Sequence, residues 1–238
     1  MSAQVRAVEE LPLGDKLTDV APLDIPTQQD YAGEFVLLRP LDVERDIESL
    51  YAISHGDPEP EKLWTYMSGG PFADRDAMGT WLENLQEDSA RLLFSVESKS
   101  LGQLVGMLAY QAIDPAMQRL ELAHIWYCPE AQRTNVNTEA AYLLLKHVFD
   151  DNGYRRVEWK CDALNLKSRN AALRLGFSYE GTFKQHMVIK ERNRDTAWFA
   201  MLDSDWPKLK DHMEKWLYSP EDCSLFALNQ PQLRRAFF

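Results

Sequence analysis

The stretch from Leu120 to Phe149 constrains this chain more than any other part of its sequence. Residues 120–127 have the apolar and aromatic character of a strand, and residues 140–149 have the apolar spacing of a helix. The polar segment 132–139 between them reads Gln-Arg-Thr-Asn-Val-Asn-Thr-Glu. The first N–H groups of a helix have no partner within that helix, and they carry partial positive charge. The order strand, polar loop, helix therefore predicts a site for a phosphorylated cofactor.

The sequence of this loop narrows the choice of cofactor. It has neither the Gly-Lys-Ser/Thr of a Walker loop nor the three spaced glycines of a dinucleotide fingerprint. Its spacing, Gln132-x-x-Asn135-x-Asn137, resembles the acyl-CoA diphosphate loop of the GNAT N-acetyltransferases, which is written Gln/Arg-x-x-Gly-x-Gly/Ala. Asparagine adopts left-handed backbone angles more readily than most residues, so it can replace both glycines.

Residues further along the chain follow the same family order. A turn and a strand at 153–160 precede Asn165 and Ser168, and a helical run then ends at Leu175-Gly176-Phe177. The resulting Asn-x-x-Ser…Gly-Phe pattern is frequent in GNAT proteins. Together with the loop it resembles the branch that includes the Rim-type ribosomal-protein N-terminal acetyltransferases, over about residues 34–202.

The resemblance implies a mixed α/β (α+β) GNAT fold. This fold has a central, mostly antiparallel twisted sheet that contains one parallel, splayed strand pair and is flanked by helices. Periodicity predicts strands at 35–40, 92–96, 103–110, 119–127, 155–161, 177–190 and 194–202, with Arg192-Asn193 as the turn between the last two. Helices are expected at 43–54 with Asp42 as its cap, at 75–86 with Asp74 as its cap, and at 140–150. A further helix is expected after Ser204, which can cap it, with an irregular tail behind it. The strand at 155–161 must run parallel to that at 119–127, because a helix crosses over between them.

Three segments are expected along the chain. Residues 1–30 form an N-terminal extension, residues 31–204 form the acetyltransferase domain, and residues 205–238 form a C-terminal helix and tail packed on the core.

The resemblance also assigns cofactor-binding residues. The diphosphate is expected on the loop formed by Gln132, Arg133, Thr134, Asn135, Val136, Asn137 and Thr138. Tyr127 is expected to give backbone contacts to the pantetheine arm, and Asn165 to bind the pantetheine amides or cap the helix that it opens. Asn137 or Thr138 is also expected to cap the helix that follows the loop.

Acetyl transfer to an amine needs a base, an oxyanion donor and an acid. The resemblance places the base at Glu121, with His124 as the competing candidate. Alternation along a strand puts these two side chains on opposite faces, although a bulge would alter that parity. The oxyanion donor is expected to be the N–H of Ile125, released from sheet pairing by such a bulge.

The acid differs from the commonest family pattern. Many members carry a tyrosine four residues before the Gly of Gly-Phe, and this chain has Ala172 there. The Rim-type branch has instead a serine three residues after the asparagine that opens the helix, which is Ser168 here. Protonation of the leaving thiolate is therefore expected from Ser168 or from water. Cys128 lies beside the loop and offers a covalent route, which we rank far below direct transfer.

Composition sets outer limits on function. The formal net charge of −11 argues against direct binding of nucleic acid. The chain has no metal-type pair of cysteines, and we expect no metal site. No apolar run approaches a membrane span, and the first residues do not resemble a signal peptide, so a cytoplasmic protein is expected.

The sequence thus predicts an acetyl-CoA-dependent N-acetyltransferase. It acts by direct transfer in a ternary complex on a primary amine, either a small molecule or a protein N-terminus. Residues 55–72 and 190–195 would shape the acceptor pocket. The alternative is a catalytically weak acyl-CoA-binding sensor or scaffold. The partners are acetyl-CoA and the amine acceptor, and the chain is expected to be a monomer or homodimer.

Overall fold

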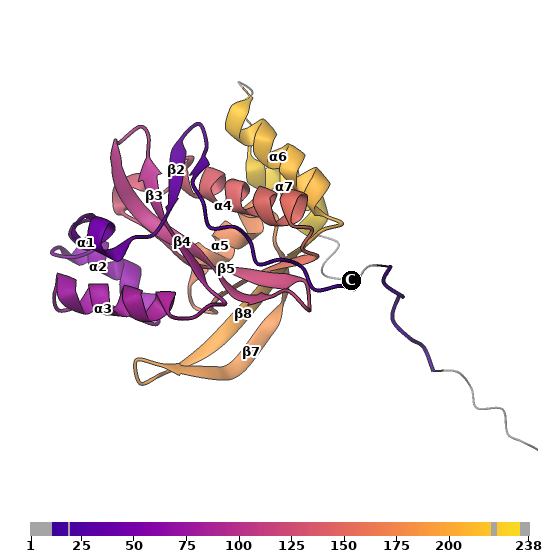
Figure 1. Cartoon of the computed structure of the whole chain (residues 1–238), viewed down its shortest axis with the longest axis horizontal. Coiled ribbons are helices and arrows are strands. Elements are labelled where there is room, and N and C mark those ends of the chain that lie inside the picture. Colours follow the sequence, from indigo (N-terminus) through magenta and orange to yellow (C-terminus); the bar gives the residue numbers. More distant parts are fainter. Residues whose placement is uncertain (1–10, 19, 220–222, 234–238) are drawn as a thin grey trace, which may run out of the picture.

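A central sheet organises the molecule. The computed structural model describes residues 11–18, 20–219 and 223–233. Eight strands form one sheet in the order β1-β2-β3-β4-β5-β6-β8-β7, and only β5 and β6 pair in parallel. The expected mixed sheet with one parallel pair is confirmed. Figure 1 shows helices α1–α3 on one side of it and α4–α7 on the other.

Seven of the strands lie close to their expected positions, and the short β1 was not expected. The strands are β1 Tyr31–Ala32, β2 Val36–Pro40, β3 Leu92–Ser98, β4 Gln103–Asp114, β5 Arg119–Tyr127, β6 Arg156–Asp162, β7 Ser178–Ile189 and β8 Arg192–Leu202. The turn between β7 and β8 falls at Lys190 and Glu191, which both have positive φ, rather than at the expected Arg192-Asn193.

The helices on the first face are fixed by capping and by apolar burial. These elements are α1 Val43–Ala52, α2 Pro58–Glu61, the 3-10 helix η1 Lys62–Tyr66 and α3 Arg75–Gln86. The Asp42 side chain accepts the N–H of Arg45 at 3.0 Å, and that of Asp74 accepts the N–H of Ala77 at 2.8 Å, so both expected caps are confirmed. Buried side chains of α1 and α3 form, with β3–β5, one of two core clusters.

The second face carries the elements α4 Val136–Lys146, the short π-helix η3 His147–Asp151, α5 Leu166–Leu175, α6 Trp206–Tyr218 and α7 Leu225–Leu233, and the 3-10 helix η2 Pro129–Ala131 precedes α4. Two expectations were wrong here. The N-cap of α6 is Asp205, which makes no side-chain capping bond, and Ser204 does not cap that helix. The tail, expected to be irregular, contains α7, which packs against α5 and α6.

The described part of the N-terminal segment lies near the turn between β4 and β5. The N–H of Leu23 donates to Pro115 O at 3.1 Å, and Gln118 Nε2 donates to Ala21 O at 3.0 Å. The Tyr154 hydroxyl donates to Asp24 O at 3.1 Å. These contacts hold residues 21–24 at the end of β5 opposite to the loop that leads into α4.

Candidate functional site

A gap opens between β5 and β6. The two strands pair only from Arg119–Arg156 to Glu121–Glu158, although β5 continues to Tyr127 and β6 to Asp162. Each strand leads beyond the gap into a helix N-terminus, α4 after β5 and α5 after β6. The splayed parallel pair is therefore present, with two partially positive helix ends next to it.

The loop into α4 presents unpaired backbone donors. Among the described residues, no acceptor within the protein is found for the N–H groups of residues 133–135, 137 and 138. Arg133 has a φ of 63°, which turns the chain sharply before the helix. Free amides at a helix N-terminus suit a phosphate group, so these residues fit the diphosphate of coenzyme A.

The expected helix cap was wrong. The helix begins at Val136, four residues earlier than expected, and the Val136 N–H donates to the hydroxyl of Thr134 at 3.2 Å. The Asn137 Oδ1 is buried without a partner in the described structure. The hydroxyl of Thr138 accepts from Arg174 Nη2 at 2.7 Å instead of capping the helix. The side chains of residues 137 and 138 therefore do not cap the helix.

Other expected cofactor residues have defined roles in the local structure. Gln132 Nε2 donates to Tyr127 O at 3.0 Å, which ties the end of β5 to the loop. Asn165 Oδ1 accepts the N–H of Ser168 at 3.1 Å, so Asn165 caps α5. The Arg133 side chain is exposed at the loop surface.

A bulge interrupts β5 within the gap. Trp126 pairs with Met107 and Ala123 pairs with Ala109, so β5 has one more residue than β4 over this stretch. The extra residue is accommodated at His124, whose φ is 51°. Ile125 follows directly, where the regular ladder is broken. The bulge on which the Ile125 expectation depends is thus present.

His124 lies in an apolar setting beside this bulge. Its Nδ1 is buried without a partner in the described residues, and its ring lies 5.9 Å from that of Trp81. Burial, aided by the charge of Arg91, lowers the pKa of His124 from 6.5 to about 4. A base with so low a pKa is poorly matched to deprotonating an ammonium group at neutral pH.

Glu121 is buried at the edge of the gap. Its side chain is only 4% exposed, and Oε2 lies 2.9 Å from Lys160 Nζ. Its neighbours Leu120 and Leu122 point into the core cluster under α4–α6, so Glu121 faces the side of the sheet that carries α1–α3. No partner is found for its Oε1 in the part of the chain that the structure describes.

Ser168 lies on the opposite face of the sheet. Its Oγ accepts a hydrogen bond from Trp159 Nε1 at 2.9 Å, and Trp159 belongs to the core cluster under α4–α6. A hydroxyl oxygen that accepts from a donor gives up its own proton more readily. The neighbouring Cys161 thiol is buried, and burial raises its pKa, although its hydrogen bond with Ser168 opposes that effect.

Aromatic side chains line the face of the sheet that carries α1–α3. Trp64 is fully buried and contacts the rings of Trp81 and Trp126. His55 accepts the N–H of Phe72 at 2.9 Å through Nε2 and contacts the Ser54 hydroxyl at 2.8 Å through Nδ1. The turn-rich segment 55–72 is therefore held in place.

The hairpin of β7 and β8 reaches the same region. Lys190 Nζ at its tip donates to Trp64 O at 2.7 Å, and burial lowers the pKa of Lys190. This contact brings together the two segments that were expected to shape an acceptor pocket.

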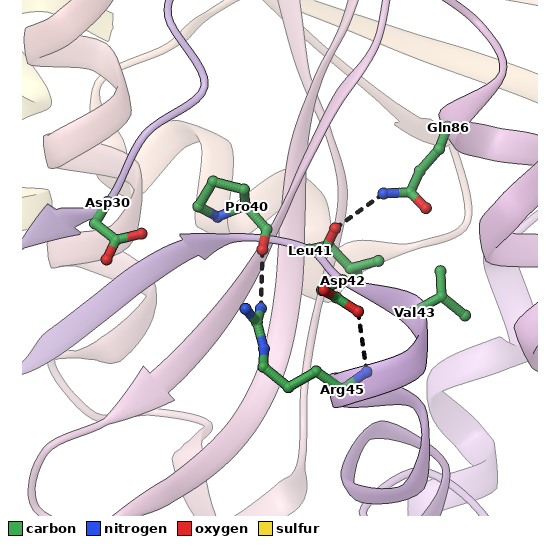
Figure 2. Close-up of a pocket in the computed structure, with 7 residues that line it drawn as sticks. All are labelled: Asp30, Pro40, Leu41, Asp42, Val43, Arg45 and Gln86. Carbon is green, nitrogen blue, oxygen red and sulfur yellow. Dashed lines mark hydrogen bonds between the residues drawn. The ribbon is translucent and has the colours of Figure 1, made fainter.

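A separate surface pocket lies where β2 ends and α1 begins (Figure 2). Its lining residues are Asp30, Pro40, Leu41, Asp42, Val43, Arg45 and Gln86. Arg45 Nη2 donates to Pro40 O and Gln86 Nε2 donates to Leu41 O, both at 2.9 Å. Because these donors are already paired and two lining residues are acidic, the pocket does not match a diphosphate.

Within residues 11–18, 20–219 and 223–233, no cluster of three or more His, Cys, Asp or Glu side chains is arranged to hold a metal ion. None of the helices in those ranges combines the length and apolar character needed to span a bilayer.

Sequence reasoning missed three residues that shape this site. Lys160 contacts Glu121, Trp159 donates to Ser168, and Arg174 donates to Thr138. Lys160 and Trp159 lie on β6. The sequence predicted that this strand pairs in parallel with β5, which could have indicated that Lys160 lies near Glu121. Nothing in the local sequence pointed to Arg174.

Comparison with known proteins gives a consistent result. The model of the acetyltransferase (GNAT) domain family matches residues 36–178. The crystal structure of a GCN5-related N-acetyltransferase from Brucella melitensis is 37% identical, with a TM-score of 0.85, and the match covers 90% of this chain and 100% of that one.

Two curated relatives are more distant. A Bacillus subtilis protein provisionally named ribosomal N-acetyltransferase, YdaF, is 24% identical over 71% of this chain and 91% of its own length. The ribosomal-protein-serine acetyltransferase of Escherichia coli is 27% identical over 42% of this chain and 55% of its own length. These relatives agree with the resemblance to the Rim-type branch.

Proposed function

This chain belongs to the GNAT acetyltransferase family, and we propose that it transfers an acetyl group from acetyl-CoA to the amino terminus of a protein. The main support for the proposal is the loop at 133–138, whose unpaired N–H groups lie beside the gap between β5 and β6. The acceptor class rests on the names of the two curated relatives, one provisionally named a ribosomal N-acetyltransferase and the other a ribosomal-protein-serine acetyltransferase.

The loop amides would bind the diphosphate, and the thioester would lie in the gap. The N–H of Ile125, at the bulge, would donate to the thioester oxygen as negative charge builds on it. In this arrangement, backbone N–H groups alone contact the two anionic groups, which are the diphosphate and the thioester oxygen. The arrangement therefore accounts for a loop with no lysine and one exposed arginine.

Acid and base would act from opposite faces of the sheet. Glu121, on the α1–α3 side, would take the proton of the ammonium group, directly or through water. The amine nitrogen then bonds to the carbonyl carbon, the carbon–sulfur bond breaks, and the second proton of the nitrogen passes to water. Ser168, on the α5 side, would give its proton to the leaving sulfur, helped by the Trp159 donor, and would regain a proton from water.

Direct transfer is favoured over a covalent enzyme intermediate. Cys128 is 1% exposed, and burial raises its pKa, so its thiol stays protonated. A buried thiol is a poor nucleophile, which leaves a ternary complex as the simpler route.

We also propose the boundaries of the catalytic domain at residues 31 and 204. The family model lies within them, and α6 packs against α4 from outside them. Residues 1–30 and 205–238 would then be additions to the catalytic domain.

The test uses acetyl-CoA and a short peptide that begins with a free serine. We expect release of free thiol, together with a mass gain of one acetyl group on the peptide. A peptide with a blocked N-terminus is the control. Turnover with small polyamines but not with this peptide would contradict the proposed acceptor.

Glu121→Gln separates an enzyme from a scaffold. We expect kcat at neutral pH to fall on the order of a hundredfold or more, because a positioned base typically contributes that much. Affinity for coenzyme A should be retained, since Glu121 lies outside the loop. Tight coenzyme A binding with no turnover of any amine by the native protein would favour the scaffold alternative.

A further inference from the structure

Lys160 occupies an unusual place beside the proposed base. Its ammonium group lies 2.9 Å from Glu121 Oε2 and 3.1 Å from Glu158 Oε2. It also lies 4.1 Å from the centre of the Trp198 ring. The side chain of Lys160 is 17% exposed, so this cation is largely removed from water.

The two carboxylates depend on Lys160 to different degrees. Glu158 is also contacted by Arg156 Nε at 2.9 Å and by Arg119 Nη1 at 3.6 Å. Burial acts to raise the pKa of Glu158, but Arg156 and Lys160 together overcome it and hold the pKa below its ordinary value. Among the described residues, Lys160 is the one cation within ion-pair distance of Glu121.

The other neighbours of Glu121 do not replace this charge. Its partner on β4 is Gln111, and Glu158 is its partner on β6. On β8, Trp198 pairs with Lys160, and on β7 the carboxylate of Glu180 is taken by Arg156 at 2.6 Å. A carboxylate with 4% exposure and one cation is strongly dependent on that cation.

We propose that Lys160 is a positioning residue for Glu121. Its ammonium group holds Oε2, compensates the negative charge of the carboxylate and leaves Oε1 available to the acceptor. The Trp198 ring and Glu158 hold the ammonium group in turn. This inference rests on the proposed function, because it assigns Glu121 the role of base.

Removing the charge of Lys160 should change the pH dependence of the reaction rather than its rate alone. A buried carboxylate without a counter-ion takes up a proton at higher pH. The variant would then lose its base over a pH range in which the native protein retains it. Lys160→Met removes the charge and leaves a side chain of similar size. Lys160→Arg keeps a positive charge at the same position.

The first experiment measures kcat/KM for acetyl-CoA and the serine peptide from pH 5 to pH 9. We expect the acid limb to move upward by about one pH unit or more in Lys160→Met and to stay near the native position in Lys160→Arg. Lys146→Met is the matched control, because that lysine pairs with Asp150 at 3.4 Å, away from both acceptor segments. Lys160→Gln replaces the Met variant if the latter does not fold.

A lower rate with an unmoved acid limb in Lys160→Met would show a merely structural role and overturn the proposal. A second readout needs no turnover. Carbon-13 NMR of the glutamate carboxyl groups, with Glu121→Gln for assignment, should show Glu121 titrating at higher pH in Lys160→Met than in the native protein. Equal titration of Glu121 in the two proteins would overturn the proposal even if the native protein shows no acetyltransferase activity. Failure of this inference is therefore distinguishable from failure of the proposed function.

Discussion

Single side chains beside the gap have hydrogen-bond partners that would suit them to acyl transfer. A serine hydroxyl is a weak acid, and nothing in the sequence near Ser168 compensates for that. The structure supplies Trp159 Nε1 as a donor to its oxygen at 2.9 Å. The contact joins β6 to α5, which local sequence patterns do not reveal.

Replacing Ser168 with Ala should affect both chemistry and stability. We expect kcat to fall about tenfold to a hundredfold with coenzyme A affinity unchanged, because the leaving thiolate loses its proton source. The free energy of unfolding should fall by about 1–3 kcal/mol, since the buried Trp159 N–H loses its acceptor.

Steady-state kinetics and urea denaturation measure these two effects. Ser89→Ala, at an exposed position, is the control. An unchanged kcat in Ser168→Ala would remove Ser168 from the mechanism and leave water as the acid.

The sequence predicted the backbone features of the site better than its side-chain contacts. The bulge in β5 and the loop at 132–138 follow from local pattern and from the family resemblance. The partners of Glu121, Thr138 and Ser168 come from other elements, and their contacts depend on packing that a single sequence does not encode visibly.

At the scale of elements, α4 shows how the loop is held. Glu139 in its first turn is fully buried, and its carboxylate accepts the N–H groups of residues 34, 35 and 36 at 2.6–2.7 Å. The Tyr218 hydroxyl of α6 donates to the same group at 2.9 Å. This one side chain therefore joins α4 to the β1–β2 turn and to α6.

Glu139→Gln should be strongly destabilising. An amide in place of the carboxylate places a donor against backbone donors and removes the charge that they stabilise. We expect a loss of about 2–4 kcal/mol in the free energy of unfolding, measured by urea denaturation. Glu83→Gln, at an exposed position of α3, should be close to neutral. Equal stabilities of the two variants would contradict this account.

Most elements were predictable because their periodicity or caps are strong. Strand 119–127 matches β5, and Asp42 and Asp74 cap their helices as expected. The start of α4 was placed too late because its first turn is polar, although polar residues are common at helix starts. Helix α7 was missed because its sequence contains Pro231, and its packing against α5 and α6 is not visible in local pattern.

At the scale of the whole molecule, the sheet separates two environments. The face that carries α1–α3 holds the aromatic cluster and Glu121, and the opposite face holds the larger core and Ser168. His124 lies at the junction, and burial lowers its pKa to about 4. The stability of the fold should therefore depend on pH, with a contribution from this residue.

The sign of that dependence follows from proton binding. Between pH 6.5 and pH 4 the unfolded chain binds a proton at His124 and the folded protein does not, so stability falls as pH falls through this range. The pKa difference corresponds to on the order of 3 kcal/mol at most. His55, whose pKa burial also lowers, contributes in the same direction.

His124→Gln should flatten the dependence. Urea denaturation at intervals from pH 4 to pH 7 measures the slope, and His186→Gln, at an exposed histidine, is the control. A variant slope as steep as the native one would show that His124 is readily protonated in the folded protein.

The central claim is that backbone donors of the loop at 133–138 bind the diphosphate of coenzyme A. Isothermal titration calorimetry of coenzyme A and of pantetheine, which lacks phosphates, tests it most directly. Asn137→Pro removes one free N–H, since proline is tolerated in the first turn of a helix, and Asn137→Ala keeps that N–H while removing the same side-chain amide.

The account predicts that coenzyme A binds far more tightly than pantetheine. It also predicts that Asn137→Pro weakens coenzyme A binding by about tenfold or more relative to Asn137→Ala, as expected for a hydrogen bond to a charged group. Pantetheine affinity should be the same in both variants. No binding of coenzyme A, or equal affinity for coenzyme A and pantetheine, would contradict it.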